Sequence, residues 1–203
     1  MRIPFFPLGT VLFPGAPLVL HVFEERYREL LRTCLAEDRR FGVVLISRGS
    51  EVGGGEERER IGTIASIERV HPLGDGRSLL EARGTERIEV RAWADDDPFP
   101  RGEYEPFPSP SSDVPPGRIA EATDALRRAR ALAMQLYANA TPLPELPDVS
   151  PEALGWWLCE QAPLSVYDRQ RLLESPTLGA RLEMLLGALD ELTTTIAWLR
   201  DRD

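Results

Sequence analysis

The residue types that most often carry acid–base, nucleophilic or metal chemistry are scarce in this chain of 203 residues. It contains two histidines, His21 and His71, and neither has a second histidine at a spacing typical of metal ligands. All 24 basic residues are arginines, which excludes a Walker-A lysine, a Schiff-base lysine and a Ser-Lys dyad. The sequence also has no Gly-x-Ser-x-Gly nucleophile elbow. We therefore expect no catalytic site.

Two other features resemble ligand sites but have simpler explanations. The run Asp95–Asp97 could attract a divalent cation, yet a charge run in a loop is usually solvated. The three glycines Gly53–Gly55 precede acidic Glu56 and Glu57, which would repel a phosphate. The sequence thus predicts neither a metal nor a cofactor. An enzyme of unknown chemistry would need a deep pocket with a strongly perturbed carboxylate beside His21.

The two cysteines, Cys34 and Cys159, lie far apart and form no Cys-x-x-Cys motif. Each falls on the apolar side of a helical pattern, which is typical of a buried free thiol. Free thiols fit a reducing compartment, so we expect a cytoplasmic protein.

Net charge and apolar patterning exclude two classes of partner. The 33 acidic residues outnumber the 24 arginines, so the net charge is −9, whereas phosphate binding needs a cationic face. The first 23 residues are largely apolar, but four prolines and two glycines prevent a continuous helix there. No uninterrupted run of about 20 apolar residues exists elsewhere. We expect no nucleic-acid partner and no membrane span.

The first half of the chain reads as strands with one inserted helix. Short apolar runs bounded by proline and glycine, 3–6 and 18–23, favour strands over helices. A helix is predicted from about Glu24, with Arg39 and Arg40 at its end, as the helix dipole prefers. Its apolar stripe comprises Tyr27, Leu30, Leu31, Cys34 and Leu35.

Further strands are expected after this helix. Residues 41–46 form a continuous apolar run, residues 47–60 read as a loop, and residues 61–70 read as a strand. Asp75-Gly76 marks a hairpin turn over 73–77. Period-two alternation then predicts strands around 80–83 and 87–92, followed by a last edge strand over 101–107.

A proline-rich stretch divides the chain. Seven prolines between Pro98 and Pro116 disfavour helix, and they predict a boundary between a β-domain, residues 1–110, and a helical domain, residues 111–203. Helices are expected over 119–140, after the N-cap Ser150, after Ser165 and from Pro176. The last has an apolar seam of Leu182, Leu185, Leu189, Leu192, Ile196 and Leu199. A bundle core and a dimer or partner interface both explain such a seam.

The opening segment FFPLGTVLFPGAPL, residues 5–18, places prolines and glycines at fixed offsets among apolar residues. It resembles the start of the substrate-binding N-terminal domain of Lon proteases. The similarity continues over residues 20–27, 38–46, 61–65 and 84–88, and in the helical half over 163–165, 169–174 and 181–182. It thus spans essentially the whole chain.

This resemblance implies an α+β fold: a six-stranded PUA-like β-barrel or pseudobarrel with one embedded helix, followed by an α-helical bundle. It also implies a role in capturing unfolded or tagged polypeptides for an ATP-driven protease. The chain has no lysine for an ATPase or Ser-Lys protease module. It is therefore similar to stand-alone bacterial members of the family, and we expect a non-enzymatic polypeptide-binding module.

Candidate contact residues lie around the first loops and on one later helix. Some of these residues have a structural alternative. Phe23 and Tyr27 could pack in the core, and Pro14 could stiffen its loop. His21 could be a hydrogen-bonded structural histidine. Adjacent helical residues lie about 100° apart, so two neighbouring tryptophans cannot both face one core stripe. Exposure of one of them for contact and burial of it between neighbouring helices explain this pair equally well. The candidates are Phe13, Pro14, His21, Phe23, Glu24, Tyr27, Trp156 and Trp157.

A second hypothesis makes the chain a scaffold or adaptor. Its C-terminal helices would then pair with a second copy or dock on a partner, for which full-length Lon protease is a candidate. Under either hypothesis we expect a monomer or a weak homodimer. RNA binding by analogy with other PUA-like barrels is a third idea, and the acidic charge weighs against it.

Overall fold

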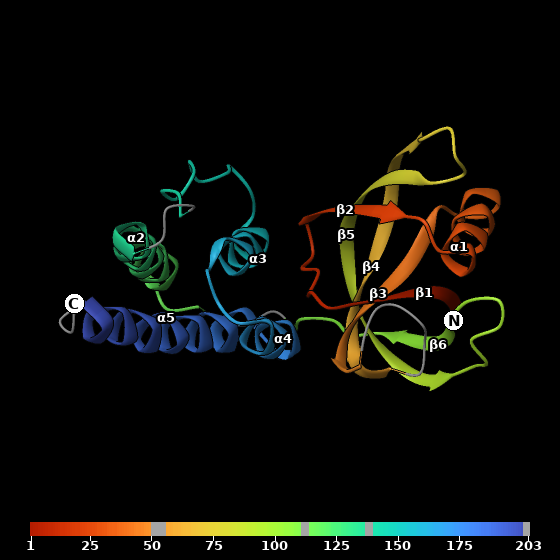
Figure 1. Ribbon diagram of the computed structural model, residues 1–203. Coiled ribbons are helices and arrows are strands. Elements are labelled where there is room, and N and C mark those ends of the chain that lie inside the picture. The colour runs from red at the N-terminus through yellow and green to blue at the C-terminus, as the bar shows by residue number, and fades with distance from the viewer. Residues whose placement is uncertain (50–55, 111–113, 137–139, 201–203) are drawn as a thin grey trace. The chain divides into compact units, whose positions relative to one another are not determined.

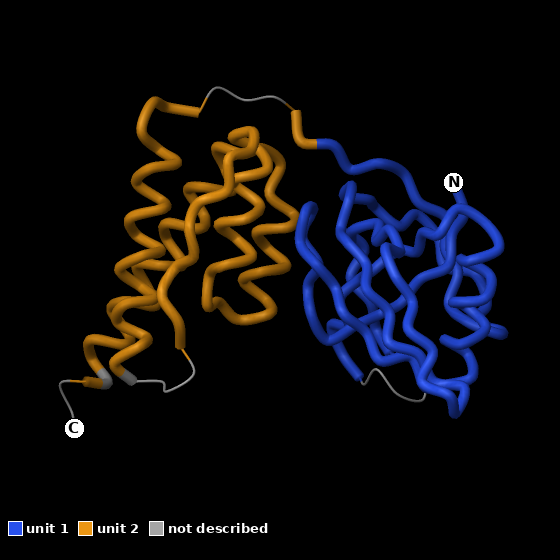
Figure 2. The backbone as a smooth tube through the Cα atoms, turned by 90° about the horizontal axis from the view of Figure 1, so that it is seen from above, with its two compact units in different colours: residues 1–108 blue, residues 109–203 orange. Residues whose placement is uncertain are grey.

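The computed structural model describes residues 1–49, 56–110, 114–136 and 140–200. The chain divides into two compact units, Met1–Pro108 and Ser109–Asp203 (Figure 2). The predicted domain boundary, between residues 110 and 111, stays a prediction. The glycine run at 53–55 lies outside the described residues.

In the residues that the structure describes, the first unit is a mixed sheet of six strands with one helix inserted. Along the chain, helix α1 follows β2 and precedes β3, and it packs against β1 (Figure 1). The strand order is β2-β5-β4-β3-β1-β6, and β5 also pairs with β6. Strands β1 and β3 are parallel, and the other paired strands are antiparallel. The elements are β1 (Arg2–Leu8), β2 (Pro17–Val22), α1 (Glu25–Ala36), β3 (Arg40–Arg48), β4 (Glu57–Pro72), β5 (Ser78–Trp93) and β6 (Arg101–Pro106).

The long β4–β5 hairpin follows the predicted turn but has longer strands than expected. Gly74 and Gly76 adopt positive φ angles of 75° and 84°, which glycine tolerates without strain. The two short strands predicted after the turn are one continuous strand, β5, whose ladder with β6 shifts register between Val90 and Ala92. Such a bulge changes which face the next residue occupies, so Ala92 is exposed rather than buried.

Helix α1 is shorter than predicted. It ends at Ala36, and Arg39 has a left-handed φ of 60° before Arg40 opens β3. Leu35 is 39% exposed, contrary to the predicted stripe. Eight residues at 100° each place Leu35 about 80° from Tyr27, at the margin of the apolar face.

The last strand is not an edge. Strand β6 pairs with both β1 and β5, and this leaves β2 with β5 as its one partner in the described sheet. The predicted α+β class is confirmed, while the finer prediction of a PUA-like barrel or pseudobarrel stays a prediction.

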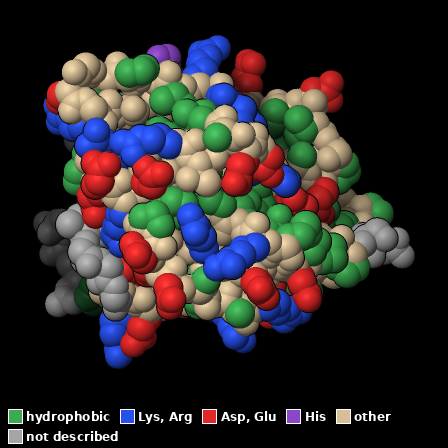
Figure 3. Space-filling model, turned by 90° about the vertical axis from the view of Figure 1, so that its right-hand side faces the viewer, with side chains coloured by type: hydrophobic (Ala, Val, Ile, Leu, Met, Phe, Trp, Pro, Cys, Tyr) green, Lys and Arg blue, Asp and Glu red, His purple; other side chains and the backbone are tan. Residues whose placement is uncertain are grey.

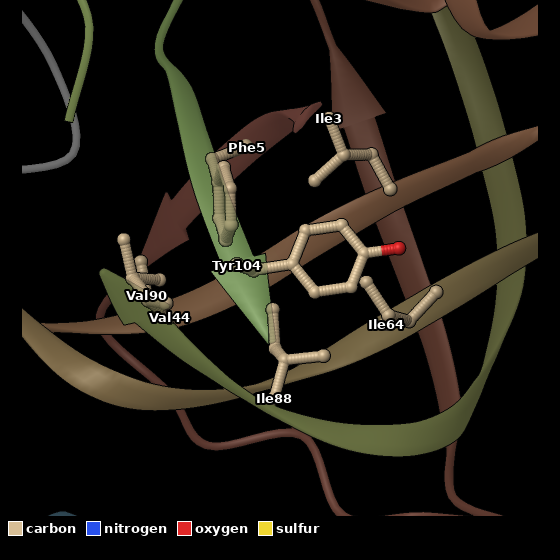
Figure 4. Packing of buried hydrophobic residues seen from close by; sticks show 7 residues of the cluster. All are labelled: Ile3, Phe5, Val44, Ile64, Ile88, Val90 and Tyr104. Atoms are coloured by element: carbon tan, nitrogen blue, oxygen red, sulfur yellow. The ribbon is translucent and has the colours of Figure 1, made fainter. Parts of the chain in front are cut away.

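Side chains from five strands fill the centre of the first unit. Figure 4 shows the ring of Tyr104, from β6, between Ile3, Ile64 and Ile88. Phe5, Val44 and Val90 complete the cluster, and Phe5 also meets the edge of the Trp93 ring at a centroid distance of 5.0 Å. Burial of these apolar groups stabilises the sheet by removing them from water.

We predict opposite effects of alanine at two glycines. A Cβ at Gly84 would lie 2.2 Å from the carbonyl oxygen of Phe13, whereas a Cβ at Gly187 has no neighbour within 4 Å. Gly84→Ala should therefore lower the free energy of unfolding by about 2 kcal/mol. Gly187→Ala, in the interior of a helix, should raise it by about 0.5–1 kcal/mol. Urea denaturation followed by far-UV circular dichroism measures both, and a neutral Gly84→Ala would contradict the close approach.

The described part of the second unit contains four helices. Ser150 and Ser165 cap α3 and α4 as predicted, since their side chains accept hydrogen bonds from the backbone N–H groups of Ala153 and Asp168. The described part of the first long helix ends at Leu136. In the last helix the seam residues Leu182, Leu185, Leu189 and Ile196 are buried, and Leu192 is half-buried. The helices are α2 (Arg118–Leu136), α3 (Pro151–Gln161), α4 (Val166–Glu174) and α5 (Leu178–Arg200).

The buried side chain of Arg181 contacts several segments of the second unit. Its side chain is fully buried, and its guanidinium carbon lies 3.1 Å from the ring centroid of Trp156. The guanidinium also pairs with Glu152 at 2.9 Å and donates to the hydroxyls of Ser175 and Ser109 at 3.2 Å each. One side chain thereby joins α5, α3 and the segments before α2 and α5.

Candidate functional site

Among the strands that the structure describes, β2 pairs with β5 alone, so its other backbone edge has no strand partner there. Gly84 N–H donates to the Ala16 carbonyl at 2.9 Å, and the antiparallel register continues from there along the strand. Because alternate residues of an antiparallel strand point their backbone groups toward and away from the partner, those of Val19 and His21 point away from β5. We call these outward groups the β2 edge. The residues bonded toward β5 are Leu18, Leu20 and Val22.

A pocket of about 260 Å³ lies beside this edge. Its base is the Phe6 and Tyr27 pair, whose buried rings stack at a centroid distance of 3.9 Å and an interplanar angle of 12°. Val19 and Phe23 are 60% and 52% exposed and form part of its rim. We call it the β2–α1 pocket, and it is lined by Phe6, Leu8, Val19, Leu20, His21, Phe23, Glu24 and Tyr27.

The charges at the β2–α1 pocket are internally paired. The Glu24 carboxylate accepts from Arg26 Nε at 3.1 Å, and the Arg26 guanidinium lies over the Tyr27 ring, 4.4 Å from its centroid. Burial raises the pKa of the Tyr27 hydroxyl well above its ordinary value, so that hydroxyl stays protonated at neutral pH. The pocket is thus an apolar depression with a compensated charge pair at its rim.

Four of the predicted contact residues meet in this pocket: His21, Phe23, Glu24 and Tyr27. His21 lies in strand β2 and is exposed, with its ring 5.8 Å from that of Phe23. The reason is that β2 buries one face, so alternate residues face solvent. The same alternation identifies Val19, a rim residue that the sequence analysis missed.

The other predicted residues lie elsewhere. Phe13 is fully buried in the first unit, and Pro14 beside it is half-buried. Trp156 is buried beneath Arg181 in the second unit, while Trp157 is half-buried there. The side chains of Phe13 and Trp156 are therefore not available at the surface for a ligand.

Within the described ranges, no three His, Cys, Asp or Glu side chains are grouped so that they could hold a metal ion. None of the helices in those ranges is both long and apolar enough to cross a bilayer. Acidic and basic side chains are interspersed over the face drawn in Figure 3, so that face is no continuous cationic surface. The charges shown there do not resemble a phosphate-binding patch.

The two thiols should be inert in the folded protein. Cys34 and Cys159 are free and buried, and burial raises the pKa of each thiol to about 12. Ellman's reagent at pH 8 should label neither in buffer and both in urea; rapid labelling in buffer would contradict their burial.

The raised thiol pKa values also make the free energy of unfolding depend on pH. Unfolded thiols ionise above about pH 9, so the contribution of the buried, protonated thiols to stability is complete below pH 9 and declines toward pH 12. Alanine at both positions should flatten that decline in denaturant titrations.

Comparison with known proteins agrees with this architecture. The family model of the ATP-dependent protease La (LON) substrate-binding domain matches residues 2–191. A crystal structure of a Lon N-terminal domain protein from Xanthomonas campestris superposes with a TM-score of 0.67 at 32% identity, covering 92% of this chain and 98% of that one. The N-terminal domain of a Mycobacterium avium complex Lon protease, at 19% identity, shares the fold with a TM-score of 0.65, covering 94% and 98%.

Among curated relatives, Lon protease 2 of Herpetosiphon aurantiacus is 28% identical over 203 residues. That alignment covers 94% of this chain and 24% of the relative, so the chain spans about a quarter of that protein's length. Three observations lead to the same assignment: the mixed sheet with its inserted helix, the helical unit, and the family match over residues 2–191. The chain belongs to the LON substrate-binding domain family.

Proposed function

We propose that the chain is a non-enzymatic module that binds extended, apolar segments of unfolded polypeptides at the β2 edge and the β2–α1 pocket. The observation that carries the proposal is the juxtaposition of an unpaired strand edge with an apolar pocket, in a chain of a substrate-binding family. A bound segment would need no cofactor. The cytoplasm remains the predicted compartment, and delivery of bound chains to full-length Lon is part of the proposal.

The geometry suggests how such a segment would be held. An added strand would exchange backbone hydrogen bonds with Val19 and His21, and these bonds are independent of the ligand's sequence. Alternate side chains of the added strand face opposite sides of the sheet, so every second one could reach the pocket. Burying an apolar side chain against Phe23 contributes about 1.5–3 kcal/mol, while ordering the segment offsets part of this. We therefore expect micromolar dissociation constants and broad specificity for apolar sequences.

A matched pair of ligands tests the proposal. Reduced, carboxymethylated α-lactalbumin stays unfolded, whereas the disulfide-bonded protein presents no extended apolar segment. Isothermal titration calorimetry should show micromolar binding of the first and none of the second, with little change between 50 and 500 mM NaCl because the contact is apolar. No binding of the unfolded form at about 1 mM, or equal binding of both forms, would contradict the proposal.

A second candidate function is an adaptor that associates through its C-terminal helices. The observation that favours it is the exposure of Trp198 on α5, at 56%, and of Met134 on α2, at 45%. Sedimentation equilibrium of the chain and of Trp198→Ala tests self-association. A monomer at about 1 mM chain, together with no co-sedimentation with full-length Lon, would exclude this role.

A further inference from the structure

The second unit holds a cavity of about 510 Å³ that the proposed function does not use. This volume lies in the range of small-molecule sites. Arg130 of α2 lies in its lining, together with Gln161 at the end of α3. The remaining walls are mostly apolar, formed in part by Ala133, Ala162, Pro163, Leu192 and Ile196.

Arg130 is held in place by neutral acceptors. Its Nε donates to the Thr141 carbonyl at 2.9 Å, its Nη1 to the Gln161 carbonyl at 2.6 Å and its Nη2 to the Thr141 hydroxyl at 2.7 Å. A guanidinium has five N–H groups, so these three bonds fix its plane and leave two donors. In the described parts of the chain, no carboxylate forms an ion pair with it.

The acidic residue in the cavity lining is already neutralised. Glu160 pairs with Arg169, Oε2 to Nη2, at 2.5 Å, and Arg169 also donates to the Glu160 carbonyl at 3.2 Å. Glu160 is therefore not the counter-ion of Arg130. The cavity combines apolar walls with one oriented cation, although the whole chain carries a net charge of −9.

We infer that this cavity binds an apolar chain that ends in a carboxylate. The carboxylate would accept hydrogen bonds from the two remaining Arg130 donors, and the apolar chain would lie against Leu192 and Ile196. Such a group occurs both in a free aliphatic acid and at the C-terminus of a polypeptide with apolar last residues. The site lies in the helical unit, so it is independent of the β2 edge.

Paired probes that differ in charge alone test this inference on the unaltered chain. Octanoate is compared with octanamide, and a hexapeptide of alanine and leucine with a free C-terminus is compared with its amidated form. Methyl ¹H–¹³C spectra should shift at Ala133 and Ile196 on addition of an acid form. The amide forms should bind at least about tenfold more weakly, because a charged hydrogen-bonded pair is lost.

Binding of octanoate identifies a free acid as the source, and binding of the free-C-terminus hexapeptide alone identifies a chain end. Arg130→Gln should abolish the difference between acid and amide. The matched variant Arg128→Gln, on the same helix but outside the cavity lining, should retain it. Equal binding of acid and amide by the unaltered chain, or no binding of either acid at 5 mM, would overturn the inference even if Arg130→Gln fails to fold.

Discussion

Arg181→Ala should lower the free energy of unfolding of the helical unit by about 3 kcal/mol or more. The substitution removes the Trp156 stacking partner and three hydrogen-bonded contacts at once, and it leaves a large cavity in the core. Urea denaturation followed by tryptophan fluorescence measures the change, since Trp156, one of the four tryptophans, lies against the guanidinium.

Two matched variants separate the possible causes. Arg181→Met keeps most of the volume and loses the charge, so it should cost less than Arg181→Ala. Arg171→Ala removes a largely exposed arginine paired with Asp168, and it should change the stability by less than about 0.5 kcal/mol. If Arg181→Ala were no more destabilising than Arg171→Ala, Arg181 would not hold the unit together.

Val19→Pro should weaken the binding of unfolded polypeptide at least tenfold while the fold persists. The Val19 N–H points away from β5, so a proline removes no bond of the sheet, and Pro17 already occupies an equivalent outward position. The same change deletes a donor for the incoming strand and places a ring in its path. Val19→Thr, which keeps the N–H, should bind almost as the unaltered chain does.

A pocket variant provides an independent test of the same site. Phe23→Ser removes an exposed ring from the rim of the β2–α1 pocket and should weaken binding about tenfold without loss of stability. Phe13→Ser, at a fully buried position, should instead unfold the first unit. If the Val19→Pro variant bound unfolded polypeptide with unchanged affinity, strand addition at β2 would be excluded, regardless of the affinity of the Phe23→Ser variant.

Local features of the fold could be read from the sequence, whereas long-range pairing could not. Ser150 with Pro151 identified the start of α3, and Asp75-Gly76 identified the hairpin. That β6 joins both β1 and β5, leaving β2 as the edge, depends on contacts between segments far apart in the chain. Alternation within a strand carries no information on its neighbours.

Buried charge was equally hard to foresee. Arg181 lies four residues before the seam residue Leu185, at the margin of the apolar face, where an arginine usually keeps its charged group in water. It is buried because Trp156, Glu152 and Ser109, from other segments, satisfy it. The four candidate residues that line the β2–α1 pocket are close in sequence, whereas Trp156 and Trp157 belong to the other unit.

Amide hydrogen exchange at β2 tests the proposed strand addition most directly. The ¹⁵N-labelled chain would be compared with and without a saturating apolar peptide of about ten residues. Strand addition predicts that the Val19 and His21 N–H groups, which point away from β5, become protected by tenfold or more, while Leu20, already bonded to β5, changes little. Peptide binding that leaves the exchange of Val19 and His21 unchanged would contradict the account.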